Sequence, residues 1–111
     1  MNESMLLSQI IKALYPWVHL YRANVGTVKT DKGYRFSTGL PKGFSDLFGT
    51  LPADKSRTGC ATPVFIECKT DGGTLRPEQE KVLAAEKANG SIVGVAYTVE
   101  QAVNLIRPHL R

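Results

Sequence analysis

The sequence predicts an α/β domain in which a central mixed β-sheet is flanked by helices, in the order α-β-β-β-β-α-β-α. Apolar residues recur at helical spacing near the N-terminus and near the C-terminus, whereas short runs of β-branched and aromatic residues lie between glycines and prolines. Residues 63–98 run strand, helix, strand, which is a βαβ unit whose two strands are parallel. A chain of 111 residues is expected to form one domain over residues 1–111.

The first half of the chain predicts a helix followed by strands. Residues 2–15 place Leu6, Ile10 and Leu14 on one helical face, Asn2 or Ser4 can cap the start, and a proline follows. Residues 17–25 alternate and are rich in β-forming residues, which predicts a strand. The turn signal at 30–33 joins this strand to residues 34–36 in a hairpin or a long twisted ribbon.

The second half predicts the rest of the sheet and two helices. Residues 46–51 form a short strand, 53–62 an exposed loop, and 63–70 the most strand-like run of the chain. Residues 76–89 form a helix with Pro77 in its first turn and Gly90 after its end. Residues 91–98 form another strand, and a capping box from Thr98 to Gln101 opens a last helix.

Composition and charge narrow the function. The chain is 42% hydrophobic and 22% charged, which is typical of a globular protein, and its net charge of +4 favours an anionic partner. No stretch reaches the roughly 18 apolar residues of a membrane helix, and an acid stands where a signal peptide carries positive charge, so a cytoplasmic location is expected. Two cysteines and two histidines without zinc-ligand spacing argue against a disulfide framework and a structural zinc site.

An acid and a base interrupt the apolar run FIECKT. In a strand, Glu67 and Lys69 point to the same face, about 7 Å apart. If residues 46–51 pair antiparallel with this strand, Asp46 lies opposite that face. A hard divalent cation such as Mg²⁺ relieves the repulsion between two carboxylates, and an adjacent ammonium can stabilise charge on a phosphate. These groups suffice for metal-assisted hydrolysis of a phosphodiester.

The same residues also have ordinary structural explanations. An Asp at the start of a strand commonly caps a turn, and a Glu-X-Lys pair commonly forms a salt bridge on a solvent face. The apolar setting of the charges, with Asp46 about twenty residues upstream, favours the functional interpretation.

Three segments carry a resemblance to a known family: GFSDLFG, VFIECK and LRPEQEKVLAAEKANGSIVGVAYT. Together they resemble the VRR-NUC domain, the virus-type replication-repair branch of the PD-(D/E)XK nuclease superfamily, and in particular its stand-alone phage and bacterial members. The resemblance implies a restriction-endonuclease-like core and covers nearly the whole chain. One departure is Ser45, which stands where the family usually has a proline that fixes the turn.

The resemblance also implies roles for individual residues. Asp46 and Glu67 ligate Mg²⁺ or Mn²⁺ together with the backbone carbonyl of Cys68, and Lys69 is the catalytic lysine. Gln79 supports that lysine and the substrate phosphate, although an ordinary exposed helix glutamine is the alternative. Glu3 completes the acidic cluster through the metal or its water shell, although an acid in a first helical turn is otherwise simply favourable.

Basic residues crowd the segment before Asp46 and are candidates for DNA phosphate contacts, the alternative being a solvated basic surface. The candidates are Arg22, Lys29, Lys32, Arg35 and Lys42, with Arg57 in the 53–62 loop as a clamp. Tyr21, Tyr34 and Phe36 lie among them and could stack on splayed bases or fill the core.

The expected function is therefore a divalent-metal-dependent DNA endonuclease. The resemblance implies branched DNA such as a Holliday junction as substrate, in replication, recombination or repair, cut by a homodimer in a bacterium or a phage-infected host cell. One alternative is a non-catalytic module that binds nucleic acid or protein on the same scaffold, against which the presence of Asp46, Glu67 and Lys69 argues. Another is a restriction-type enzyme, for which the chain has little room for base-reading loops.

Overall fold

The computed structural model describes residues 1–25 and 27–111, and at 27, 28 and 36 it describes the backbone alone. Its helices are α1 (Glu3–Leu14), α2 (Pro77–Ala88) and α3 (Val99–Ile106), followed by the 3-10 turn η1 (Arg107–His109). Its strands are β1 (His19–Arg22), β2 (Thr27–Lys29), β3 (Arg35–Ser37), β4 (Leu47–Leu51), β5 (Thr62–Cys68) and β6 (Ile92–Ala96). Among these residues, no helix has the length and apolarity needed to cross a membrane.

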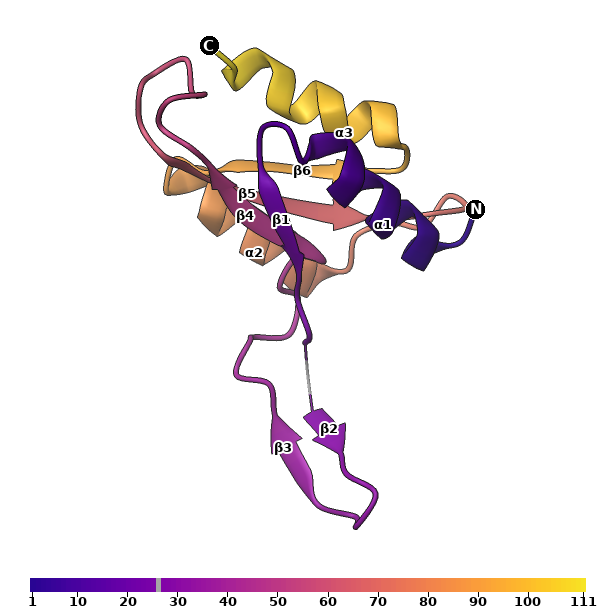
Figure 1. Cartoon of the computed structure of the whole chain (residues 1–111). Coiled ribbons are helices and arrows are strands. Elements are labelled where there is room, and N and C mark those ends of the chain that lie inside the picture. Colours follow the sequence, from indigo (N-terminus) through magenta and orange to yellow (C-terminus); the bar gives the residue numbers. More distant parts are fainter. Residues whose placement is uncertain (26) are drawn as a thin grey trace.

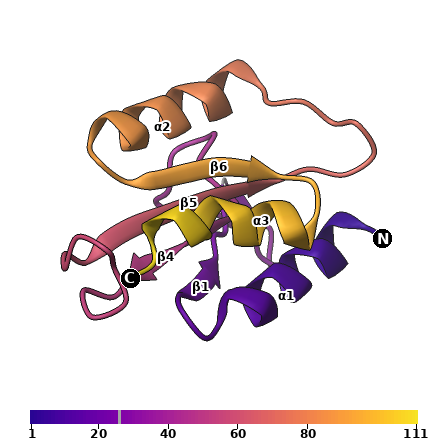
Figure 2. The same ribbon diagram turned by 90° about the horizontal axis from the view of Figure 1, so that it is seen from above.

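The molecule is a mixed four-stranded sheet between two helical layers. The strand order is β1-β4-β5-β6, with β4 antiparallel to both of its neighbours and β5 parallel to β6. Figure 2 shows α2 on one side of the sheet and α1 with α3 on the other. The parallel pair confirms the predicted βαβ unit, and the antiparallel β4–β5 pair confirms the condition on which the Asp46 prediction rested.

The core lies between the sheet and the α1/α3 layer. Leucines and isoleucines of α1 pack against alternate residues of β5 and against α3. Ile66 and Cys68 are fully buried on this face. The buried residues contributed by the helices are Leu6, Leu7, Ile10, Leu14, Ala102 and Ile106.

Side-chain hydrogen bonds cap the N-termini of α1 and α3 at the residues predicted from the sequence. The Asn2 side chain accepts a hydrogen bond of 2.8 Å from the Met5 N–H, which identifies Asn2 as the N-cap of α1. The Thr98 hydroxyl accepts one of 3.1 Å from the Gln101 N–H. The Gln101 side chain accepts from the Tyr97 N–H instead of the Thr98 N–H, so the predicted capping box is shifted by one residue on that side.

The β2–β3 hairpin stands out from the body of the molecule (Figure 1) and contributes to its long dimension of 49 Å. Its antiparallel pairing and the hydrogen bond from the Gly33 N–H to the Thr30 carbonyl confirm the predicted hairpin and turn. The single strand predicted over 17–25 was too long. The N–H groups of Trp17 and Val18 donate to the Leu14 carbonyl at the end of α1, so β1 begins only at His19. Because β2 is a separate strand, five strands precede α2 instead of the predicted four.

Candidate active site

The sheet register brings Asp46 and Glu67 together at one edge of the sheet. Leu47 pairs with Ile66, so the residue before Leu47 and the residue after Ile66 are cross-strand neighbours. The Asp46 carboxylate lies at the last residue of β5, because its Oδ2 accepts a hydrogen bond of 2.9 Å from the Cys68 N–H. The juxtaposition expected from the spacing of the two acids is therefore present.

Glu67 is a buried carboxyl group that lies beside Asp46. The residue is 2% exposed, and its Oε1 accepts a hydrogen bond of 3.3 Å from the Gln79 amide. Its Oε2 is buried and accepts no hydrogen bond from a donor among the described residues. Burial raises the pKa of Glu67 to about 9; a hydrogen bond with the Asp46 side chain and the charge of Asp46 raise it further, and Lys69 opposes them. A cation that favours the ionised form would also give Oε2 a partner.

Gln79 joins helix α2 to Glu67. At the third position of α2, its Oε1 accepts a hydrogen bond of 2.9 Å from the Arg76 N–H, while its Nε2 donates to Glu67. The side chain is 5% exposed, so the alternative of an ordinary exposed helix glutamine is wrong. The contact made by the Gln79 amide is with Glu67, whereas the resemblance implied support of Lys69.

Lys69 follows the last residue of β5 and is half-buried. Its N–H donates to the Ala96 carbonyl at 3.1 Å, which extends the pairing with β6 by one residue. Its charge lowers the pKa of Glu67 and so opposes the effects of burial and of Asp46. The Tyr97 hydroxyl donates a hydrogen bond of 2.7 Å to the carbonyl of Gly73, whose backbone lies against the Lys69 side chain. Sequence reasoning gave no role to Tyr97.

Glu3 lies in the exposed first turn of α1. Its charge is the smallest of the effects that raise the pKa of Glu67, and it also contributes to raising the pKa of the Cys68 thiol. Burial is the main reason that the pKa of Cys68 reaches about 12, so this thiol is protonated at neutral pH. Glu3 therefore contributes to the electrostatic surroundings of Glu67, as an exposed residue.

Gly43 holds the segment before Asp46 against α2. Its φ is +94°, and a Cβ at this position would overlap the Glu78 carbonyl oxygen. The neighbouring Phe44 packs edge-to-face on Phe48 and Phe65. Buried Ser45, in the place of the family's proline, donates a hydrogen bond of 2.9 Å to the Leu47 carbonyl and so fixes the turn by other means. The only sequence signal for Gly43 was its place in the GFSDLFG segment.

The donors at this edge suit a hard divalent cation. The described residues contain no group of three or more His, Cys, Asp or Glu side chains arranged around a metal. The Asp46 and Glu67 carboxylates, one of them with an unsatisfied oxygen, form the kind of sparse oxygen site at which Mg²⁺ keeps several waters and binds substrate phosphate.

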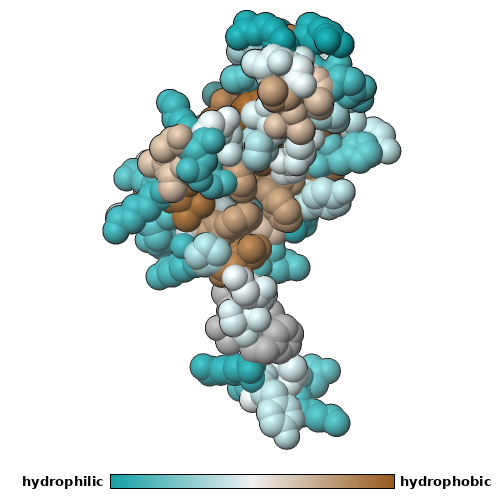
Figure 3. All heavy atoms as spheres, turned by 90° about the vertical axis from the view of Figure 1, so that its left-hand side faces the viewer, coloured by the Kyte–Doolittle hydropathy of each residue, from teal (hydrophilic) through white to brown (hydrophobic). Residues whose placement is uncertain are grey.

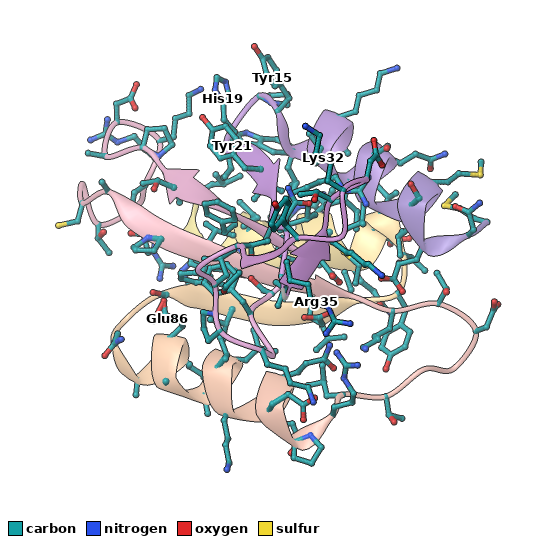
Figure 4. All side chains as sticks on the ribbon, turned by 90° about the horizontal axis from the view of Figure 1, so that it is seen from below. Tyr15, His19, Tyr21, Lys32, Arg35 and Glu86 are labelled. Atoms are coloured by element: carbon teal, nitrogen blue, oxygen red, sulfur yellow. The ribbon has the colours of Figure 1, made fainter. Side chains whose placement is uncertain are left out.

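Most of the predicted DNA contacts are exposed cations in and around the hairpin. Arg22 ends β1 and is exposed, and Lys29, Lys32 and Arg35 are exposed on the hairpin; Figure 4 shows Lys32 and Arg35. Lys42 is highly exposed, with its Nζ 3.8 Å from a Glu78 oxygen. Lys29 and Arg35 belong to strands β2 and β3 of the hairpin, which extends away from the four-stranded sheet.

Arg57 and the aromatic candidates are placed differently. Arg57 lies in the loop before β5, and its N–H donates to the His109 carbonyl. The strand from Thr62, where β5 begins, to Glu67 is itself about 17 Å long. The structure therefore does not bring Arg57 to the carboxylates. This loop is exposed as predicted except at Ser56, which is buried. Tyr34 is 72% exposed on the hairpin, and the Phe36 side chain lies outside the described part of the structure.

Comparison with known proteins gives one family. The model of the VRR-NUC domain matches residues 30–100, a range that includes Asp46, Glu67, Lys69 and Gln79. No curated protein and no solved structure matches the chain.

Proposed function

Because the chain belongs to the VRR-NUC family of nuclease-like domains, we propose that it is a divalent-metal-dependent DNA endonuclease with a PD-(D/E)XK core. The observation that carries the proposal is the pair of carboxyl groups: Glu67 is buried beside Asp46 and its Oε2 accepts no hydrogen bond from a donor among the described residues. Two carboxyl groups this close, one of them buried, cannot both ionise at low cost unless a cation lies between them.

The proposed ligands of Mg²⁺ or Mn²⁺ are the carboxylates of Asp46 and Glu67 and the backbone carbonyl of Cys68, with Glu3 acting through water. When bound, the ion would supply an activated water and neutralise charge on the phosphate. Gln79 donates a hydrogen bond to Oε1 of Glu67 and so helps to fix this side chain, whose Oε2 would then hold the ion. The Lys69 ammonium would donate hydrogen bonds to the phosphate as charge develops during hydrolysis, which would leave a 5′-phosphate.

The proposed substrate is branched DNA. The exposed cations of the hairpin, Lys29, Lys32 and Arg35, would contact phosphates beyond the cleaved bond, with Arg22 and Lys42 closer to it. A homodimer would present two active sites to two strands of a four-way junction. We also propose that residues 1–111 act as one domain, since α1 and α3, which lie partly or wholly outside the matched range, pack on each other and on the sheet.

The test is a cleavage panel of junction, flap, duplex and single-stranded DNA with Mg²⁺, Mn²⁺ or EDTA. We expect metal-dependent cutting that is strongest on a branched substrate, and a loss of about a hundredfold or more in Lys69→Ala. Lys87→Ala is the control, because Lys87 is exposed in the last turn of α2.

The other outcomes separate the alternatives. Binding of DNA without cutting in either metal would favour the non-catalytic module. Cutting of Lys69→Ala at the wild-type rate would refute the role of the lysine, and equal cutting of all four substrates would refute the preference for branched DNA.

A further inference from the structure

Part of the sheet face that carries the active site is uncovered. Helix α2 packs against β6, and beyond it the sheet is hollowed over β1 and β4. Nine residues line this hollow of about 520 Å³. They include Trp17, His19, Tyr21, Phe48, Thr50 and Lys55. Figure 3 shows apolar side chains gathered in the middle of the body above the hairpin, with hydrophilic residues around them.

The hollow and the two carboxylates lie on the same face of the sheet. Tyr21 pairs with Phe48, and Phe48 pairs with Phe65, so these three side chains share a face. Asp46 precedes Phe48 by two residues and Glu67 follows Phe65 by two, which places them on that face as well. The near end of the hollow is therefore about 7 Å of strand from the acids.

Four aromatic side chains line the hollow: His19 and Tyr21 are exposed, Trp17 and Phe48 are half-buried, and Tyr15 lies beside them on His19. The rings of Tyr15 and His19 stack with their centroids 4.5 Å apart and 12° between their planes, and Tyr21 lies 5.9 Å from Phe48. Tyr21 is 59% exposed. Figure 4 shows Tyr15, His19 and Tyr21 close together on this side of the sheet. Such a row of aromatic side chains on a sheet offers faces on which flat rings can stack.

Charge and size indicate what would stack there. Asp54 and Lys55 line the hollow together, so their charges offset each other, and the Lys55 Nζ is held by the Pro16 carbonyl at 2.7 Å. A hollow without excess positive charge suits an uncharged ring with polar edges better than a phosphate. Nine lining residues are also far fewer than the 20 to 30 per side of a typical protein interface, which argues against a second copy of the chain.

We propose that this hollow binds unpaired nucleobases of single-stranded DNA leading away from the cleaved bond. The proposal rests on the proposed function, which it deepens by assigning a substrate feature: a short unpaired stretch beside the cut. Tyr21 and Phe48 would receive the base nearest to the carboxylates, and His19 and Trp17 the bases farther along the strand.

The binding test uses the single tryptophan of the chain, Trp17, which lines the hollow. In EDTA, where no cutting occurs, the full chain is titrated with a short oligothymidylate and with an abasic oligonucleotide of the same length. Both ligands carry the same phosphates, but only the first carries bases. We expect the oligothymidylate to quench Trp17 fluorescence saturably and to bind about tenfold more tightly than the abasic strand.

Two variants link the effect to the hollow. Tyr21→Ala should weaken oligothymidylate binding by about tenfold and leave abasic binding unchanged, whereas Tyr21→Phe, which keeps the ring, should bind like the wild type. Because Tyr21 is mostly exposed, neither variant is expected to unfold, and circular dichroism checks this. Equal affinity for both ligands, an unaffected Tyr21→Ala, or a change in Trp17 emission that follows protein self-association alone would overturn the proposal.

The cleavage panel distinguishes this failure from failure of the proposed function. Metal-dependent cutting without a preference for bases over abasic DNA would refute the hollow alone. Preferential binding of bases without any cutting would refute the nuclease and leave the hollow as a binding site.

Discussion

At the scale of single residues, Glu67 carries most of the chemistry of this site. Its environment combines burial, a hydrogen bond with the Asp46 side chain and the charge of Asp46, each of which disfavours the ionised form of Glu67. A metal ion reverses this preference, because carboxylate ligands bind it in the deprotonated form. The same residue is therefore unfavourable for the metal-free fold and favourable for the metal-bound one.

The raised pKa of Glu67 makes stability without metal depend on pH. Between the usual carboxyl pKa of 4.5 and about 9, the unfolded chain has lost a proton that the folded chain retains. The unfolding free energy contributed by this group should therefore fall as pH rises through that interval. Thermal unfolding in EDTA at pH 5.5 and pH 8 measures it.

Glu67→Gln is the control for that pH dependence. The amide keeps the shape of the side chain and does not titrate, so the difference in melting temperature between pH 5.5 and pH 8 should be smaller in the variant. If wild type and Glu67→Gln lose stability equally with rising pH, Glu67 does not retain its proton in the folded chain.

At the scale of elements, the site depends on the contact between the 41–46 segment and the first turn of α2. Gly43 makes this contact possible, and through it the positions of Asp46 and Gln79 are linked. Gly43→Ala should lower the free energy of unfolding by about 1–3 kcal/mol and also reduce cutting, because both strain and overlap arise.

Gly39→Ala is a matched control for Gly43→Ala. Gly39 has a φ of +89° but no atom within 4 Å of an added Cβ, so it shares the backbone strain without the overlap. Denaturant unfolding of the two variants isolates the packing effect. Equal losses of stability would show that the contact with α2 is unimportant.

Much of the arrangement of helices and strands could be predicted from the sequence. The apolar runs at 63–70 and 91–98 with a helix between them identified the parallel pair, and the spacing of Asp46 and Glu67 anticipated their meeting. The burial of Gln79 and the approach of Gly43 to Glu78 could not be derived, because both arise where segments distant in the sequence pack. Alternation likewise extended the first strand through residues that the structure places in the turn after α1.

At the scale of the whole molecule, the hairpin extends from the end of the sheet at which β4 begins, directly after Asp46. Charge alone predicted DNA contacts both for the cations of the hairpin and for Arg57, because composition does not say at which end of a sheet a loop lies. The fold separates them: the hairpin starts at the acidic edge, whereas the Arg57 loop joins the opposite ends of β4 and β5.

The hairpin cations should therefore govern the salt dependence of DNA binding. Replacing Lys29, Lys32 and Arg35 with Gln should weaken binding and reduce the slope of log affinity against log salt by about 0.9 for each phosphate that the variant no longer neutralises. Fluorescence anisotropy at several salt concentrations measures the slope. The control replaces exposed cations of the helices, Lys12, Lys87 and Arg107, and removes the same charge. Equal slopes in the two triple variants would show that net charge, and not the hairpin, determines binding.

Metal binding tests the central claim most directly, because it requires no substrate. Calorimetric titration with Mn²⁺ at pH 8 should show saturable binding to the wild type, accompanied by proton release in buffers of differing ionisation enthalpy as Glu67 deprotonates. Asp46→Asn should bind at least about tenfold more weakly. Undiminished binding by Asp46→Asn, or no binding by the wild type, would contradict a metal site at Asp46 and Glu67.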